Sequence, residues 1–329
     1  MNENGLPVGA WHYTDTHGLL GMIQNNTVWA GATDFMNDEQ ELLHGLSLLK
    51  RRWVDNPQRP EGHRRIVREA LQGFEDSNEQ QYIVSASEES DSLTLWRNYG
   101  HESIGYAVCF DRSVSLVPLT VPRYAECDRF PYAGDDYLDP YIEEVEFDGQ
   151  TQHFLSEDPD QTLSRHNREW TSVIYEPEEQ EQIVDQVAQE ILEVKAKYVE
   201  SALNFYAWGK DMQWKDQLAL LKDPGFMDER EIRRHYSWVL PSWRFVRYRA
   251  TRFGVTPYVE VTTRSPGAEE VDFFGSPDDF ETQPRHLPIL GVRIGPTRYA
   301  EQAKQALTRL LQEHGYGNVS VWNSAVPYR

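Results

Sequence analysis

Cysteine is scarce in this chain of 329 residues, and the motifs of several common enzyme classes are absent. The two cysteines, Cys109 and Cys127, are too few for a disulfide framework, and their spacing does not match a zinc site. The sequence contains no Gly-rich phosphate loop, no GxSxG elbow and no HExxH helix. We therefore expect no metal, and a chemistry that depends on residues dispersed along the chain.

Long hydrophobic runs are absent too. Uncharged apolar runs span only a few residues, whereas a membrane-spanning helix needs about 20. The N-terminal sequence MNENGLPVGA has neither the basic region nor the apolar region of a secretory signal peptide. These features predict a cytoplasmic protein with no membrane partner. Hydrophobic residues make up 39% of the chain, which is enough for a folded protein with a sizeable core.

The chain contains few positively charged residues. It has 32 Lys and Arg and 53 Asp and Glu, which gives a net charge of −21. This excludes a protein that coats nucleic acid with a basic surface. Most of the acidity lies in residues 124–200, which contain 21 acidic and 5 basic side chains. We interpret this segment as a solvated, divergent helical insertion within a single domain of residues 1–329. A protein-binding or DNA-mimicking surface is the alternative.

Hydrophobic periodicity predicts helices and strands that alternate irregularly, without the βαβ rhythm of a doubly wound sheet. Short runs rich in β-branched and aromatic residues predict strands at 8–14, 27–30, 82–87, 104–110, 115–121, 243–250, 258–263, 289–294 and 319–322. Amphipathic spacing and capping residues predict helices after Asp15 and at 38–52, 62–74, 91–98, 177–207 and 297–314. The predicted fold class is α+β, with a mixed, largely antiparallel central sheet and helices at its sides.

The first predicted strand ends in Trp11-His12-Tyr13-Thr14, directly before a helix. A histidine at a strand end that projects into a cleft can donate a hydrogen bond to a ribose hydroxyl or transfer a proton. Thr14, or a backbone amide at the helix N-terminus, can meet a negative group. The alternative is a structural histidine whose hydrogen bonds are satisfied within the fold.

A cluster of carboxylates and one amide precedes the helix predicted at 38–52 and comprises Asp34, Asn37, Asp38, Glu39 and Glu41. Helix capping and the favourable interaction of acidic residues with a helix N-terminus explain this cluster. Binding of a divalent metal is the weaker alternative.

A third group begins at Ser85 and continues to Trp96-Arg97-Asn98-Tyr99-Gly100. Trp96 and Tyr99 lie three residues apart on one helical face, and Arg97 offers a planar fork to a phosphate or carboxylate. An aromatic pair beside a guanidinium can enclose a flat heterocycle and hold its phosphates. Core packing of Trp96 and a surface ion pair of Arg97 are the alternatives.

The segment 230–252, which we call the basic stripe, contains seven arginines and a single acidic residue, Glu231. Glu231 is flanked by Arg230, Arg233 and Arg234. Such a glutamate is either held ionised and aimed at developing positive charge, or is only an ion-pair partner of its neighbours. The spacing leaves both interpretations open, and it does not distinguish Glu231 from Glu229.

Several blocks together resemble the bacterial domain-of-unknown-function family numbered 2971. They are HYT with GLLGMIQNNTVWA, DFMNDEQE, YIVSASEESDSLTLWRNYG with IGYAVCF, LKDPGFMDEREIR, ILGVRIGP and the terminal VSVWNSAVPYR. The blocks occur in the family's order and extend from His12 to Arg329. Met36 and Ile232 replace the family's usual residues, but both changes are apolar and leave the polar groups in place.

The arrangement is also similar to the ADP-ribosyltransferase superfamily. This resemblance implies an enzyme that consumes NAD and transfers ADP-ribose to a macromolecular acceptor, protein or nucleic acid, in a bacterial toxin or phage-defence setting. His12 matches the histidine that bonds a ribose, Tyr99 (or Trp96 in its place) the aromatic residue on nicotinamide, and Glu231 the glutamate near the reacting ribose. The remaining expected NAD contacts are Tyr13, Thr14, Ser85, Trp96, Arg97, Arg230, Arg233 and Arg249.

Two other classes of function remain open. The basic stripe is interleaved with Tyr236, Trp238, Trp243, Phe245 and Tyr248. A nucleic-acid-binding or nucleic-acid-processing protein would use these residues as a phosphate track with stacking platforms, whereas a twisted strand pair is the structural alternative. A non-catalytic interaction module that uses the acidic helix at 178–207 is the third possibility. The sequence contains no signal of oligomeric state.

Overall fold

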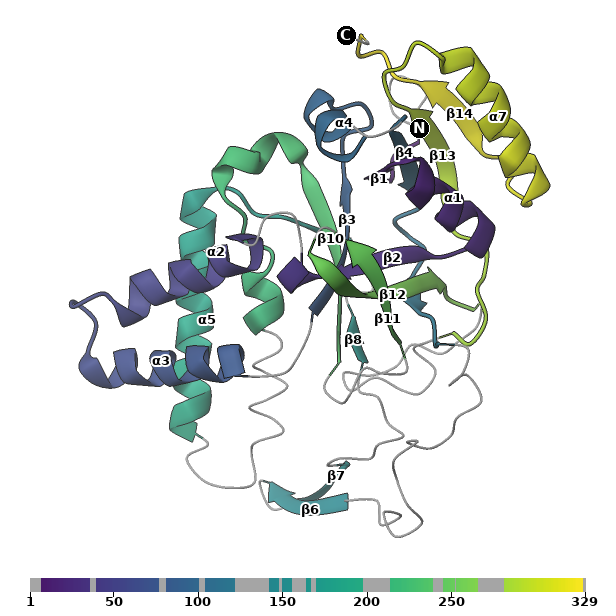
Figure 1. Ribbon diagram of the computed structural model, residues 1–329. Coiled ribbons are helices and arrows are strands. Elements are labelled where there is room, and N and C mark those ends of the chain that lie inside the picture. Colours follow the sequence, from purple (N-terminus) through teal and green to yellow (C-terminus); the bar gives the residue numbers. More distant parts are fainter. Residues whose placement is uncertain are drawn as a thin grey trace.

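The fold is that of a computed structural model of the chain, shown in Figure 1. It describes residues 7–35, 40–76, 81–100, 104–121, 142–147, 150–155, 164–166, 170–197, 214–238, 245–251, 253–265 and 281–327. The strands are β1 (Ala10–Thr14), β2 (Val28–Ala32), β3 (Gln81–Ser87), β4 (Tyr106–Phe110), β5 (Leu116–Pro118), β6 (Ile142–Phe147), β7 (Gln150–Leu155), β8 (Ser164–His166), β9 (Thr171–Ser172), β10 (Glu231–Trp238), β11 (Val246–Thr251), β12 (Gly254–Thr263), β13 (Ile289–Ile294) and β14 (Ser320–Asn323). The helices are α1 (Thr16–Asn25), α2 (Gln40–Leu49), α3 (Glu61–Asp76), α4 (Leu93–Tyr99), α5 (Pro177–Lys197) and α7 (Ala300–Glu313), with shorter turns η1 (Thr33–Phe35), η2 (Lys50–Val54) and η5 (Pro224–Glu229).

A sheet of 12 strands organises the molecule. Its main path runs β11-β12-β2-β3-β1-β4-β13-β14, with β10 beside β3 and β5 beside β12. Among the pairings between these described strands, β13–β14 alone is parallel. The predicted α+β class with a mixed, mostly antiparallel sheet is therefore confirmed.

The sheet is split along one edge of β3. On its other edge, β3 pairs with β10 over its whole length, from Gln81 to Ser87. On the split edge, β1 meets β3 at Ser87, and β2 meets it at Tyr82 and Ile83. Residues 84–86 pair with neither β1 nor β2, and Figure 1 shows β2 crossing the direction of β3. The split leaves room for side chains beside the middle of β3.

Local signals explain the first elements. The Asp15 carboxylate accepts a hydrogen bond from the Gly18 amide at 2.8 Å and caps α1, as the sequence predicted. Asn26 ends this helix in the left-handed conformation, with φ 55°. The buried face of α1 packs on the sheet through Leu19, Met22 and Ile23.

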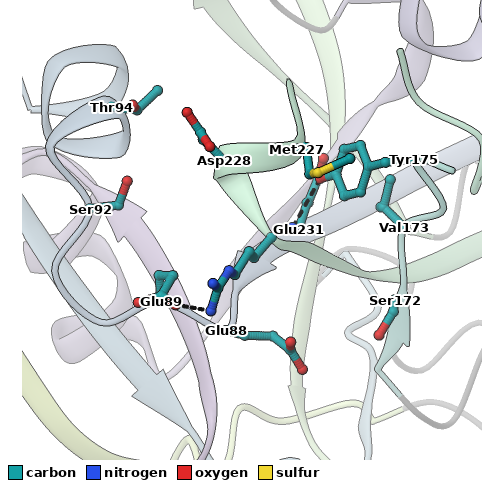
Figure 2. A pocket seen from close by; sticks show the side chains of 11 residues that line it. Glu88, Glu89, Ser92, Thr94, Ser172, Val173, Tyr175, Met227, Asp228 and Glu231 are labelled. Carbon is teal, nitrogen blue, oxygen red and sulfur yellow. Dashed lines mark hydrogen bonds and ion pairs between the residues drawn. The ribbon is translucent and has the colours of Figure 1, made fainter. Parts of the chain in front are cut away.

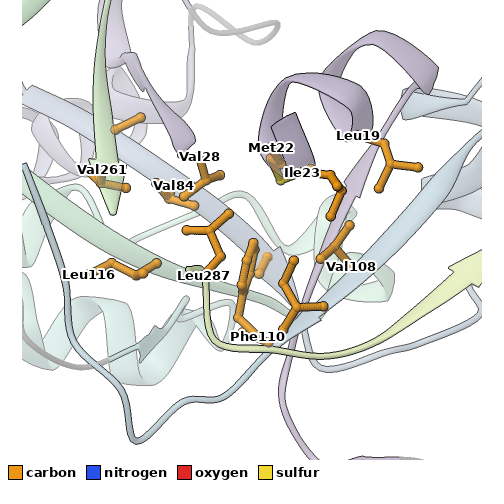
Figure 3. Close-up of a cluster of buried hydrophobic side chains, with 14 of the residues drawn as sticks. Leu19, Met22, Ile23, Val28, Val84, Val108, Phe110, Leu116, Val261 and Leu287 are labelled. Atoms are coloured by element: carbon orange, nitrogen blue, oxygen red, sulfur yellow. The ribbon is translucent and has the colours of Figure 1, made fainter. Parts of the chain in front are cut away.

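The main hydrophobic core lies between the sheet and the helices on one of its faces. Figure 3 shows Leu19, Met22 and Ile23 of α1 close to Val108 and Phe110 of β4, with Val28 and Val84 beyond them. Period-two alternation along the strands produces this layer, because successive side chains point to opposite faces of the sheet.

A separate helical layer, formed by α2, η2, α3 and α5, has its own core of buried residues around Trp53, Phe74, Ile191 and Trp214. One carboxylate stabilises it: Asp185 of α5 accepts hydrogen bonds from Arg52 at 2.8 and 2.7 Å and from the Trp53 indole at 2.7 Å. Figure 1 shows these helices grouped beside the sheet. The chain segment that contributes Trp214 and Leu218 to this layer meets β10, where Arg233 donates to the Ala219 carbonyl oxygen at 2.7 Å.

Two expectations about structure need correction. The acidic segment 124–200 is not entirely helical, because β6 and β7 form an antiparallel hairpin and β8 and β9 pair with β10. Its helix, α5, is described to Lys197, and the predicted continuation to 207 lies outside the described residues. β10 was not predicted, because its central residues Arg233, Arg234 and His235 are polar and hide the apolar alternation on which strand prediction depends.

Candidate active site at the split of the sheet

His12 occupies the split between β1 and β3. Its Nδ1 lies 2.8 Å from the Ser85 carbonyl oxygen. A carbonyl oxygen only accepts, so Nδ1 donates and Nε2 of the neutral ring is left as an acceptor. Burial lowers the pKa of His12, which keeps the ring neutral. Within the described residues, no group forms a hydrogen bond with Nε2.

The short helix α4 covers this region. Its N-cap Ser92 accepts a hydrogen bond from the Leu95 amide, and the Ser92 amide donates to the Tyr13 hydroxyl at 3.0 Å. Trp96 is buried, packs edge-on against Tyr13 at 4.6 Å and donates to Asp91 at 2.8 Å. Trp96 is therefore a packed residue that orients α4. Tyr99, at the end of the same helix, remains 38% exposed.

Two cavities meet at Glu231. The inner pocket, of about 70 Å³, is lined by Trp11, His12, Tyr13, Ser85, Ala86, Ser87, Leu95, Tyr99, Glu229 and Glu231. The outer cleft, of about 580 Å³, is lined by Glu88, Glu89, Ser92, Thr94, Ser172, Val173, Tyr175, Met227, Asp228, Arg230 and Glu231. Figure 2 shows Glu231 and Tyr175 on one side of the outer cleft and Ser92 and Thr94 on the other. The structure thus brings His12, Tyr99 and Glu231 to one pocket.

Glu231 is held by two cations. Arg233 donates to it from Nε at 2.7 Å and from Nη2 at 2.8 Å, and Lys222 Nζ donates at 2.9 Å. Burial alone raises the pKa of the Glu231 carboxyl, but the charges and hydrogen bonds of Arg233 and Lys222 outweigh it and lower this pKa to about 2. Glu231 is therefore a buried carboxylate at neutral pH.

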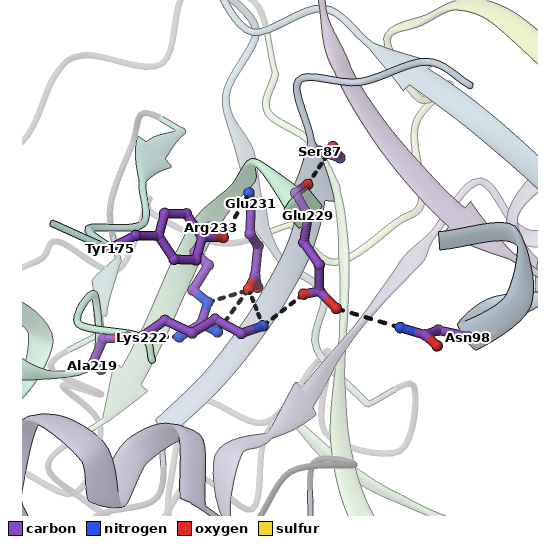
Figure 4. A network of polar contacts seen from close by, with 8 residues as sticks. All are labelled: Ser87, Asn98, Tyr175, Ala219, Lys222, Glu229, Glu231 and Arg233. Carbon is purple, nitrogen blue, oxygen red and sulfur yellow. Dashed lines mark hydrogen bonds and ion pairs between the residues drawn. The ribbon is translucent and has the colours of Figure 1, made fainter. Parts of the chain in front are cut away.

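Glu229 lies beside Glu231 in the inner pocket and shares Lys222 with it. Lys222 Nζ is 2.7 Å from Glu229 Oε2, and Asn98 makes a longer contact of 3.4 Å with Oε1 (Figure 4). Arg230, which separates the two glutamates, adopts the left-handed conformation with φ 42° and ends η5 before β10 begins. This turn places two carboxylates from one short segment around a single ammonium group.

The four arginines expected to hold phosphates do not gather in one place. Arg230 lines the outer cleft, where it forms an ion pair with Glu89. Arg233 is 1% exposed and is committed to Glu231 and the Ala219 carbonyl. Arg97 is exposed on α4 and lines neither cavity. Arg249, on β11, lies over the rings of Trp29 and Tyr258 at 5.1 and 5.7 Å. Of the four, Arg230 alone is positioned to meet a ligand in the cleft.

The remaining expected contacts divide in the same way. Tyr13 and Ser85 line the inner pocket, whereas Thr14 lines neither cavity and lies against Gly18 of α1. The Ser85 hydroxyl oxygen is buried and lacks a hydrogen-bond partner among the described residues. Tyr175 was missed by sequence reasoning. Its hydroxyl accepts a hydrogen bond from the Glu231 amide at 3.1 Å, and no local motif signals this contact from another segment of the chain.

The basic stripe does not form one exposed track within the described residues. Arg233, Arg234, Tyr236 and Phe245 are at most 1% exposed, so they line no surface groove. Arg247 forms an ion pair with Glu260 at 2.9 Å, and Tyr248 is exposed. Trp243, Arg244 and Arg252 lie outside the described residues, as do Asn37, Asp38 and Glu39 of the acidic cluster. The described part of the stripe thus contains two strands, β10 and β11, but they are not paired with each other as the twisted strand pair required: β10 pairs with β3, β8 and β9, and β11 pairs with β12.

Comparison with protein-family models, with curated proteins and with solved structures found no match to this chain. The resemblance to the family numbered 2971 therefore stays a prediction. In the described ranges, no group of three or more His, Cys, Asp or Glu side chains is arranged to hold a metal ion. No helix in the described part of the chain combines the length and apolar character needed to cross a bilayer.

Proposed function

We propose that this chain is an ADP-ribosyltransferase-like enzyme that cleaves NAD and transfers ADP-ribose to a macromolecule. The observation that supports this proposal is the convergence of His12, Tyr99 and Glu231, from three distant segments, on the inner pocket. A neutral imidazole, a partly exposed aromatic ring and a carboxylate that is ionised at neutral pH are groups that suit this glycosyl transfer.

The reaction breaks the bond between the ribose C1′ carbon and the nicotinamide nitrogen. Nicotinamide leaves with the bonding electron pair, and positive charge develops on the ribose. Glu231 is ionised before substrate binds, so its carboxylate stabilises this charge without a preceding proton transfer. A hydroxyl or amine of the acceptor then forms the new bond to C1′ and loses its proton.

Polar groups of the inner pocket suit the ribose hydroxyls of a nucleoside, of which this pocket of about 70 Å³ holds only a part. Nε2 of His12 accepts a hydrogen bond from a ribose hydroxyl, and the Ser85 hydroxyl, which has no partner in the described residues, supplies a second polar contact. Tyr99 lines the same pocket with a ring that is 38% exposed, and stacking of this ring on nicotinamide fixes the base next to Glu231.

The volume of the cavities restricts where the rest of the dinucleotide lies. The inner pocket of about 70 Å³ is too small for a dinucleotide, so the diphosphate belongs in the outer cleft of about 580 Å³. Arg230 is the arginine available there. Its ion pair with Glu89 is exposed, and such pairs stabilise proteins by only about 0–1 kcal/mol, so a phosphate can replace Glu89 as partner.

Nicotinamide release from NAD, followed by chromatography, tests the proposal. We expect His12→Ala and Glu231→Gln each to reduce the rate by about 100-fold or more, because each removes a group in contact with the reacting nucleoside. Arg230→Ala is expected mainly to raise KM, and Arg249→Ala, on β11, to leave the rate and KM unchanged. Intact turnover in both His12→Ala and Glu231→Gln would refute the assignment. Circular dichroism confirms that each variant is folded.

A further inference from the structure

Lys222 is a buried lysine whose ammonium group lies between the carboxylates of Glu229 and Glu231. Its side chain is 3% exposed, and its ammonium group contacts Glu229 at 2.7 Å and Glu231 at 2.9 Å. Figure 4 shows Lys222 reaching between these two carboxylates from the side opposite Asn98. A buried lysine is rare unless it is paired, and here one ammonium serves two acceptors.

The backbone of Lys222 is anchored independently of the glutamates. Its amide donates to the Ile174 carbonyl at 3.1 Å, and its carbonyl accepts from the Gln180 side chain at 2.7 Å. Gln180 is itself buried in α5 and also bonds Ile174. The helical layer therefore fixes where Lys222 enters the site.

The two glutamates depend on Lys222 to different degrees. Glu231 retains a bidentate contact with Arg233 when Lys222 is removed. Among the described residues, the Glu229 carboxylate retains only the contact of 3.4 Å with Asn98, which is too long for a strong hydrogen bond. Without Lys222, one guanidinium would face two buried carboxylates a short distance apart. Two like charges in such a site repel each other, which favours the uptake of a proton by one of them.

Several charged or titratable groups surround the two glutamates. Those that line the pocket or cleft, or lie close to the glutamates, are His12 and Tyr13 of β1, Tyr99 of α4, Tyr175, Lys222, Arg230, Arg233, His235, Glu88, Glu89 and Asp228. Lys222 and Arg233 are the cations among them that contact Glu231. Arg230 pairs with Glu89 instead, and burial keeps His235 neutral.

We propose that Lys222 is a positioning residue that holds the carboxylates of Glu229 and Glu231 side by side in the wall of the inner pocket. The inference deepens the proposed function and rests on it only in assuming that Glu231 acts as a carboxylate. In this inference the buried ammonium group of Lys222 serves to balance the charge of the two carboxylates, and its main role is not to stabilise the packing of the helical layer.

The pH dependence of nicotinamide release by the full chain distinguishes these roles. In Lys222→Met we expect the acid limb of the rate profile to move up by about one pH unit or more, since one of the two carboxylates now takes up a proton. In Lys222→Met/Glu229→Gln the pair is again one cation and one anion, so the acid limb should return toward the wild-type position. A purely structural lysine would lower the rate equally at every pH.

A second measurement requires no enzymatic activity. The free energy of unfolding of the wild type, the single variant and the double variant is measured in urea at pH 5 and at pH 7.5. Without Lys222, the raised carboxyl pKa makes the folded state take up a proton as the pH falls, so the destabilisation by Lys222→Met should be smaller at pH 5 than at pH 7.5. The double variant should be more stable than Lys222→Met at pH 7.5.

The outcomes separate the two proposals. If the wild type releases no nicotinamide, the proposed function fails, while the stability comparison still decides the role of Lys222. If Lys222→Met does not fold but the double variant does, the predicted coupling is supported. A double variant that is no more stable than Lys222→Met, or a destabilisation by Lys222→Met that is independent of pH, would overturn the inference.

Discussion

Asp91 is the residue whose removal gives the sharpest test of how the site is held together. Its carboxylate lies between β3 and α4 and accepts four hydrogen bonds. The donors are Trp96 at 2.8 Å, Arg293 at 2.8 Å, Ser324 at 2.5 Å and the Ala325 amide at 2.7 Å. They come from α4, β13 and the tail that follows β14. Asp91 therefore links α4, the helix that carries Tyr99, with the C-terminal part of the chain.

The expected cost of Asp91→Ala follows from burial. The Arg293 and Asp91 side chains are 10% and 15% exposed, so the variant leaves a nearly buried guanidinium without its carboxylate. Removing one partner of a buried ion pair costs about 3–5 kcal/mol. Because both groups retain some solvent contact, we expect a value near the lower end, about 3 kcal/mol. By comparison, Glu88→Ala disrupts the more exposed pair with Arg112 and should cost at most about 1 kcal/mol.

Urea unfolding followed by tryptophan fluorescence measures these changes, with the slope m checked for constancy. Hydrogen exchange reports whether the loss is local, because detachment of α4 and the tail would expose their amides before the sheet opens. Adding Arg293→Met to Asp91→Ala removes the orphaned charge and should recover part of the loss. A cost below about 1 kcal/mol, with unchanged exchange in α4 and the tail, would refute the reasoning.

Two further predictions concern the interior. Burial, helped by the charge of Arg233, lowers the pKa of His235 to about 3, and neither ring nitrogen has a hydrogen-bond partner among the described residues. The unfolded chain binds a proton below about pH 6.5 that the folded chain resists, so stability falls as the pH drops from 6.5 toward 3. His235→Leu should remove a slope of about 1.4 kcal/mol per pH unit from urea unfolding measured between pH 6 and pH 4, and equal slopes in both proteins would contradict this. A Cβ added at Gly45 of α2 would lie 2.3 Å from the Leu218 carbonyl oxygen, so Gly45→Ala should destabilise by about 1–3 kcal/mol in the same assay. The control Gly62→Ala, which meets open space in α3, should be neutral or slightly stabilising, and equal effects at both positions would count against this explanation.

Sequence reasoning located most elements where a strong local signal exists. The cap at Asp15 and the apolar face of α1 are both contained in a few consecutive residues, and the structure has them as predicted. β10 was not predicted because its polar residues are buried by distant partners. Arg234, for example, donates to the Val114 carbonyl oxygen, which lies 120 positions away in the chain, and its guanidinium lies over the Trp170 ring. Local propensity does not report such compensation, since it is supplied from elsewhere in the chain.

In the candidate site, too, the structure brings together some of the residues that were chosen from the sequence and leaves others elsewhere. His12, Tyr99 and Glu231 were chosen from the sequence by residue type and family resemblance, and the structure places all three around one pocket. Arg249 was chosen in the same way, yet it stacks on Trp29 and Tyr258 of neighbouring strands and lines neither cavity. A surplus of arginines in one segment shows how much charge is present, whereas the direction of each side chain depends on the register of the strand.

By itself, then, the sequence determined the α+β class, the overall acidity and the residue types available for chemistry, because these follow from composition and short-range periodicity. The tertiary structure alone decided which of those residues meet. The split of the sheet at β3 admits His12, the turn at Arg230 directs Glu229 and Glu231 to one ammonium, and the anchored backbone of Lys222 brings that ammonium from the helical layer. The pairing at β3 and the anchoring of Lys222 by Gln180 join segments that are remote in the chain, and the shorter step from Lys222 to the two glutamates is fixed by them. Their energies depend on packing and strand pairing that no local stretch of residues encodes.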